Sequence, residues 1–199
     1  MLEIVRDYLK TATGFLRESS KAFNAVKKKD VREAFRYLLV LGFIVAILQI
    51  IVQLLIGFAT TDMEQAFASY YANPAYSIAY TFIVIYLSSV VSSTIVALWL
   101  HLWAFIFGAR KGLGETIKTV FYGQSPLYLM GWIPLLNFVA MIWSFILMRT
   151  GLTRLQSMDA GKAAAAMLLA VIIPLIIVGI LAFTLYNIFG PSIFQTMGI

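Results

Sequence analysis

Long apolar runs separated by short polar turns dominate the chain after residue 36. The runs cover about residues 37–59, 76–108, 116–132, 134–152 and 163–189. A helix rises about 1.5 Å per residue, so about 20 apolar residues cross the hydrocarbon core of a bilayer. The pattern therefore predicts an all-α, polytopic integral membrane protein with five transmembrane helices, the third and fourth forming a short hairpin.

The stretch from Thr116 to Leu152 decides the number of crossings. It is too long for one crossing and nearly right for two short ones, which need the tight turn that residues 131–134, Gly-Trp-Ile-Pro, supply. A hairpin here places all 15 Lys and Arg on one side of the membrane, whereas a single span would export Arg154 and Lys162. The positive-inside rule favours the hairpin, with a cytoplasmic amino terminus and an extracytoplasmic carboxyl terminus.

Residues 1–36 form a separate region before the transmembrane domain of residues 37–199. Arg6, Lys10 and Arg17 alternate with apolar residues at helical spacing, namely Leu2, Val5, Tyr8, Leu9, Ala12, Phe15 and Leu16. The spacing predicts a cytoplasmic amphipathic helical region, which can lie among lipid headgroups. A solvated charged tail is the alternative.

Composition agrees with a membrane location. Hydrophobic residues make up 61% and charged residues 12%, against roughly 45–50% and about 25% in soluble domains. The net charge of +6 is concentrated before the first span, where nine of the 15 Lys and Arg lie between Arg6 and Arg36. Because this charge flanks membrane-spanning runs, the expected partners are anionic headgroups of the cell membrane rather than nucleic acid.

Several motifs occur in an order and spacing that resemble a known membrane family. They are residues 23–34 (Phe-Asn-Ala-Val-Lys-Lys-Lys-Asp-Val-Arg-Glu-Ala), His101, Gly108, Gly112, Gly114, the segment from Thr116 through Tyr122 to Pro126, Pro134, Trp143 and the pair Gly151-Leu152. On these residues the chain resembles the Yip1-domain family of five-span membrane proteins, in its archaeal or bacterial branch.

The resemblance implies a fold and a topology more than an activity. Eukaryotic members are associated with prenylated Rab GTPases, with other family members and with vesicle-membrane organisation, which suggests a scaffold or membrane-shaping protein. The chain lacks the Asp-Leu-Tyr-Gly-Pro motif of those relatives, so Rab binding is not carried over.

A basic glycine turn is the first candidate binding site. The glycines let backbone N–H groups approach an anion, and the start of the following helix adds a positive dipole end. The candidate residues for headgroups or partners are Arg110, Lys111, Gly112, Gly114, Lys118, Arg149 and Arg154. A tight turn anchored by the positive-inside rule is the alternative.

Polar residues inside the spans form the second candidate, an intramembrane seam. Its members are Gln49, Gln53, Ser92, His101, Gln124 and Ser125. The only histidine, His101, lacks a nearby carboxylate or second imidazole, so it is expected to hydrogen-bond across the bundle rather than to bind a metal. Gly123 to Pro126 should break the third span, because proline removes an intrahelical hydrogen bond.

Two functions remain open. The first is a membrane scaffold or adaptor that organises membrane or recruits partners, including other copies, through the amphipathic region and the basic loops. The alternative is a small carrier or lipid-handling protein that uses the seam. The spans contain no Ser-His-Asp set or carboxylate pair, so we expect no enzyme, no catalytic residues, no cofactor and no metal.

Overall fold

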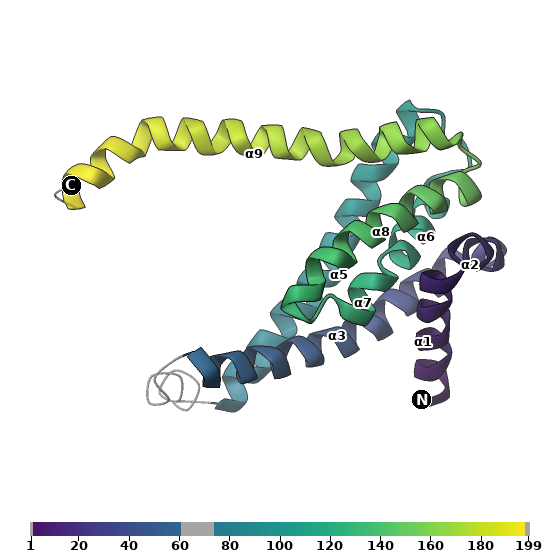
Figure 1. The fold of residues 1–199 in the computed structure, drawn as a ribbon, viewed down its shortest axis with the longest axis horizontal. Helices are drawn as coiled ribbons and strands as arrows, with labels where there is room; N and C mark the ends of the chain where they lie inside the picture. Colours follow the sequence, from purple (N-terminus) through teal and green to yellow (C-terminus); the bar gives the residue numbers. More distant parts are fainter. Residues whose placement is uncertain (1, 61–73, 198–199) are drawn as a thin grey trace.

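The structure is a computed structural model, and it describes residues 2–60 and 74–197. Over these residues every element is a helix, which confirms the all-α prediction there. The elements are α1 (Leu2–Arg17), α2 (Ser19–Val26), α3 (Val31–Thr60), α5 (Pro74–Ile106), α6 (Leu113–Gly123), α7 (Ser125–Met130), α8 (Pro134–Leu155) and α9 (Ala160–Met197). Figure 1 shows α3 and α5 running side by side, and α9 leaving the bundle as one long helix.

Within residues 2–60 and 74–197, four helices are long and apolar enough to cross a membrane. The segments are Val31–Ile56, Ser77–Ile106, Pro134–Leu155 and Ala160–Ile188. The region expected to be the third span instead forms α6 and α7, which meet at Gln124 and are too short to cross singly. A fifth crossing therefore requires α6 and α7 in series.

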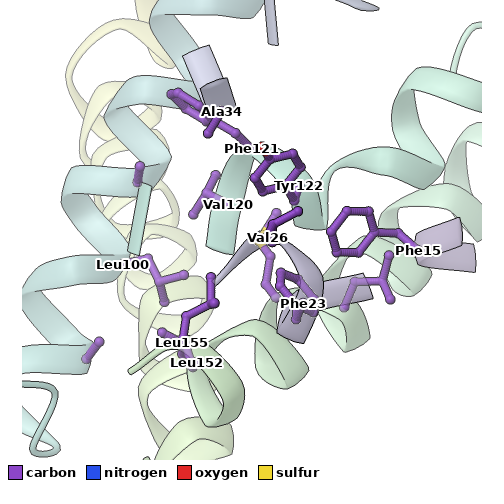
Figure 2. Close-up of a cluster of buried hydrophobic side chains, with 14 of the residues drawn as sticks. Phe15, Phe23, Val26, Ala34, Leu100, Val120, Phe121, Tyr122, Leu152 and Leu155 are labelled. Atoms are coloured by element: carbon purple, nitrogen blue, oxygen red, sulfur yellow. The ribbon is translucent and has the colours of Figure 1, made fainter. Parts of the chain in front are cut away.

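The short helix α6 lies at the centre of the bundle. It packs against α3, α5 and α8, and its residues from Lys118 to Gly123 are all buried. Figure 2 shows Val120, Phe121 and Tyr122 of α6 among side chains from the surrounding helices. Large aliphatic side chains on the outer faces of α3, α5, α8 and α9 are exposed, as expected for surfaces in contact with lipid.

The two amino-terminal helices belong to this packed core. The Phe15 ring of α1 stacks on Tyr122 with centroids 5.3 Å apart and meets the Phe23 ring of α2 edge-on at 4.7 Å. A Cβ atom on Gly151 of α8 would lie 2.9 Å from the Phe23 ring, which is closer than real Cβ contacts. Glycine at 151 therefore allows α2 to pack directly on α8.

The break between α6 and α7 leaves one carbonyl without its helical partner, and a serine satisfies it. Pro126 has no N–H to donate to the carbonyl of Tyr122, four residues earlier. The Ser125 hydroxyl donates to this carbonyl instead, and Tyr37 Oη of α3 lies 2.7 Å from Ser125 Oγ. Because the serine proton is used, the tyrosine is the donor in that second bond. One hydrogen bond, from Tyr37 to Ser125, thus ties the break to α3.

Pro174 in α9 likewise leaves a carbonyl without its helical donor, and a tryptophan side chain supplies one. The proline cannot donate to the carbonyl of Ala170, and Trp99 Nε1 of α5 donates to that oxygen at 2.8 Å. α9 continues as one helix through Pro174. An indole N–H thus joins α9 to α5 at the point where the helix lacks its own hydrogen bond.

We predict that Trp99→Phe lowers the free energy of unfolding by about 1–2 kcal/mol, because it leaves the Ala170 carbonyl unpaired. Trp103→Phe is the matched control on the same helix, since Trp103 Nε1 has no hydrogen-bond partner among the described residues. Thermal unfolding in detergent compares the two variants. Equal destabilisation by both would contradict the assigned role of the Trp99 N–H.

Candidate functional site

The turn between α5 and α6 lies against the turn between α8 and α9, and one glutamine joins them. Gln156 Nε2 donates to the carbonyl of Gly112 at 2.7 Å and to Thr116 Oγ1 at 3.0 Å, and its Oε1 accepts from the backbone N–H of Lys111 at 3.0 Å. Gly112 holds a φ of +89°, which glycine adopts without strain. Gln156 therefore fixes the shape of the basic glycine turn.

His101 takes part in the same network from inside α5. Its Nδ1 lies 2.9 Å from Thr116 Oγ1. Since Gln156 already donates to Thr116, the threonine hydroxyl can donate its proton to the imidazole. The histidine thus hydrogen-bonds across the bundle from α5 to α6.

Three of the cations predicted to bind headgroups are occupied by other protein groups. Arg110 Nη1 donates to the carbonyls of Phe105 and Ala109 at 2.7 and 2.8 Å, and its guanidinium lies 4.5 Å from the Phe105 ring centroid. Lys111 Nζ contacts Ser157 Oγ. Arg110 therefore covers the end of α5, and Lys111 ties the two turns together.

Lys118 is the third occupied cation, and it is buried. Its side chain is only 4% exposed, and Nζ lies 2.8 Å from Glu115 Oε1. The same ammonium donates to the carbonyls of Lys27 and Lys29, just after α2, at 3.0 and 3.1 Å. Lys118 therefore ties the amino-terminal helices to the central helix.

The two remaining cations line a polar cavity. Arg149 and Arg154 of α8 border a cavity of about 460 Å³ whose other walls come from α2 and from the start of α9. Arg154 Nη2 lies 3.4 Å from Ser20 Oγ, a weak contact. The Asp159 carboxylate also borders the cavity and accepts from the backbone N–H of Gly161 at 2.8 Å. This bond and that from the Lys162 N–H lower the pKa of Asp159.

The predicted anion cradle at Gly112 and Gly114 is only partly free. The Lys111 N–H and the Gly112 carbonyl are both bonded to Gln156. A Cβ atom on Gly114 would only reach van der Waals contact with Val31 of α3, at 3.9 Å. The glycines therefore serve the turn and its packing, while the arginines of α8 face the open space.

The predicted intramembrane seam divides into separate groups. Gln124 Oε1 accepts from Ser93 at 2.7 Å and from Tyr128 at 2.8 Å, and all three side chains are buried. Ser125 instead bonds to α3, and His101 bonds to Thr116 near the end of the bundle. The structure does not bring the six residues together into one path.

The other members of the seam lie toward the surface. Gln53 and Ser92 are exposed, and Gln49 is half-buried. The Ser92 hydroxyl donates to the carbonyl of Ser89 in its own helix at 3.2 Å.

Sequence reasoning missed several members of these networks. They are Tyr37, Ser93, Thr116, Tyr128 and Gln156. Tyr128 lies four residues after Gln124, a spacing that places two side chains on one helix face, so the sequence could have predicted this contact. The contacts of Gln156 could not be predicted in this way, because no local sequence pattern marks a glutamine that reaches a distant turn.

Among the described residues, no three His, Asp or Glu side chains lie close enough to hold a metal ion.

Comparison with known proteins gives a family match over most of the chain. The model of the Yip1 domain matches residues 13–184, which include α2 through most of the spanning part of α9. No curated protein and no solved structure matches the chain significantly. The matched range exceeds half of the sequence, and the chain belongs to the Yip1 family.

Proposed function

We propose that this protein is an integral membrane scaffold or adaptor that recruits partners and organises membrane through its amino-terminal helices and basic turns, without chemistry of its own. One observation carries the proposal: α1 and α2 are fixed to the bundle by buried aromatic rings, while their outer faces are charged. Phe15 and Phe23 are fully buried, whereas Arg6, Lys10 and Arg17 are exposed. A rigid charged surface of this kind suits recognition of a partner.

The proposed topology has five crossings and cytoplasmic amino-terminal helices. The sequence argument for it is that all 15 Lys and Arg then lie on one side. The contact of Arg154 with Ser20 and that of Lys118 with the end of α2 support one common basic end. In this proposal α6 and α7 together make the third crossing, and the protein resides in the cell membrane.

Lys118→Met should release the amino-terminal helices from the bundle. The change leaves the carbonyls after α2 without their donor and Glu115 without its partner, which costs about 3 kcal/mol for a buried pair. Proteinase K should then cleave residues 1–36 of the detergent-solubilised protein roughly a hundredfold faster, because each 1.4 kcal/mol changes the population of the released form about tenfold. Lys21→Met is the control, since the pair of Lys21 with Glu18 is exposed. Unchanged cleavage in Lys118→Met would contradict the proposed anchor.

Site-specific photo-cross-linking tests the adaptor role itself. A photoreactive residue at Arg6 or Lys10, on the outer face of α1, should give discrete protein adducts in native membranes. The same residue at Leu175, on the exposed apolar surface of α9, is the control and should react with lipid. The adducts at Arg6 and Lys10 should disappear when Lys118→Met is added. Adducts that persist with α1 released, or that never form at α1, would refute the adaptor role.

A further inference from the structure

Arg149 and Arg154 differ from the other cations of the basic turns because they border a cavity, where Arg154 makes a weak contact with Ser20 Oγ at 3.4 Å. Arg110, Lys111 and Lys118 each contact a carbonyl, hydroxyl or carboxylate of the protein. The cavity beside the two arginines is lined by Ser20, Thr150 and Thr153 together with Met158, Asp159 and Ala160. Two guanidinium groups and three hydroxyl groups thus border one space.

Arg149 also carries an unsatisfied donor. Its Nε atom is buried and has no hydrogen-bond partner among the described residues. Leaving a buried donor unpaired costs free energy, and more when the group is charged. A guanidinium matches two oxygens of a phosphate or a carboxylate with two parallel N–H donors, so an oxyanion is the class of ligand that this group recognises.

The position of the cavity on α8 indicates where such a phosphate comes from. Arg149, Thr150 and Thr153 lie in the last two turns of a helix that is long and apolar enough to cross the membrane. One, two and three turns before Arg149 and Thr150, the same face of α8 carries Ile146, Ile142 and Val139, each about half exposed. The cavity therefore lies directly above a lipid-facing apolar stripe.

We propose that this cavity binds the phosphate of an anionic phospholipid, with Arg149 and Arg154 as its ligands and the acyl chains along the apolar stripe of α8. The inference deepens the proposed function, because it assigns the headgroup contact to one site. The glycine turn, which the sequence predicted as the headgroup site, is then not needed for headgroup binding.

Asp159 sets the affinity of the site for negative charge. Its carboxylate borders the cavity and at the same time accepts hydrogen bonds from the first turn of α9. Asparagine caps a helix about as well as aspartate does. Asp159→Asn therefore removes the negative charge while keeping the cap, and it should tighten phosphate binding.

The test is a lipid titration of the full-length protein in a neutral detergent, with bound lipid counted by native mass spectrometry. Phosphatidic acid should bind more tightly than phosphatidylcholine. Arg154→Gln and Arg149→Gln should each weaken phosphatidic acid binding about tenfold, and Arg149→Lys should weaken it less. Lys162→Gln removes an exposed cation of the α9 start that does not line the cavity, and it should leave binding nearly unchanged.

Several results would overturn the proposal. The first is an equal loss of phosphatidic acid binding in Lys162→Gln and Arg154→Gln. The second is equal binding of phosphatidic acid and phosphatidylcholine, and the third is unchanged phosphatidic acid binding in Asp159→Asn. Arg154 is exposed, so its variant tests the site even if Arg149→Gln fails to fold. Glycerol phosphate in place of the lipid separates the sources: binding as tight as that of phosphatidic acid would assign the site to a soluble phosphate instead.

The outcome is separable from that of the adaptor test. Loss of the lipid preference with the α1 cross-links retained would overturn this inference and leave the adaptor function standing. Loss of the α1 cross-links with the lipid preference retained would overturn the adaptor function and leave this inference standing.

Discussion

The exclusion of cations from the hydrocarbon layer is the constraint on which the rest of the structure depends. A lysine or arginine at the middle of a spanning helix costs about 2.5–3.5 kcal/mol on insertion scales. All 15 such residues of this chain lie in residues 6–36, 110–118 and 149–162. The contacts of Lys111 with Ser157, of Arg154 with Ser20 and of Lys118 with the end of α2 join these three regions in space. The three basic regions therefore form one surface, on which both proposed functions are based.

A second constraint acts inside the bundle, where every freed backbone carbonyl needs a donor. Pro126 and Pro174 each free one carbonyl; the adjacent Ser125 hydroxyl satisfies the first, and the Trp99 indole of α5 satisfies the second. Tyr37 then links the break after α6 to α3, and Trp99 links α9 to α5. Both proline sites are therefore contact points between helices: Trp99 bonds directly to the freed carbonyl of Ala170, and Tyr37 bonds to the serine that satisfies the freed carbonyl of Tyr122.

The sequence predicted the helical class and the break at residues 123–126 because apolar runs and prolines act locally. It could not predict that α6 is the most enclosed helix, since α6 is short and carries a lysine. The burial of Lys118 depends on carbonyls about 90 residues earlier in the chain, and no local pattern encodes that contact. For the same reason the glycine turn seemed the best anion site, although Gln156 occupies its backbone groups.

The candidate site shows that a charged side chain near a turn need not be available to bind a ligand. Five cations near the two turns were equivalent as sequence letters. In the structure three of them contact carbonyl, hydroxyl or carboxylate groups of the protein, whereas Arg149 and Arg154 line the polar cavity. Which cation binds a ligand is thus decided by tertiary contacts, and these lie beyond the reach of spacing rules.

Cysteine accessibility tests the one-sided arrangement of the cations most directly. The chain contains no cysteine, so single cysteines at Ser20, Ser157, Ser69 and Ser192 can be treated with a membrane-impermeant thiol reagent in intact cells. The account predicts labelling at Ser69 and Ser192 and protection at Ser20 and Ser157. Labelling at Ser157 from outside would contradict it, because the turn between α8 and α9 would then lie on the opposite side of the membrane from the other basic segments.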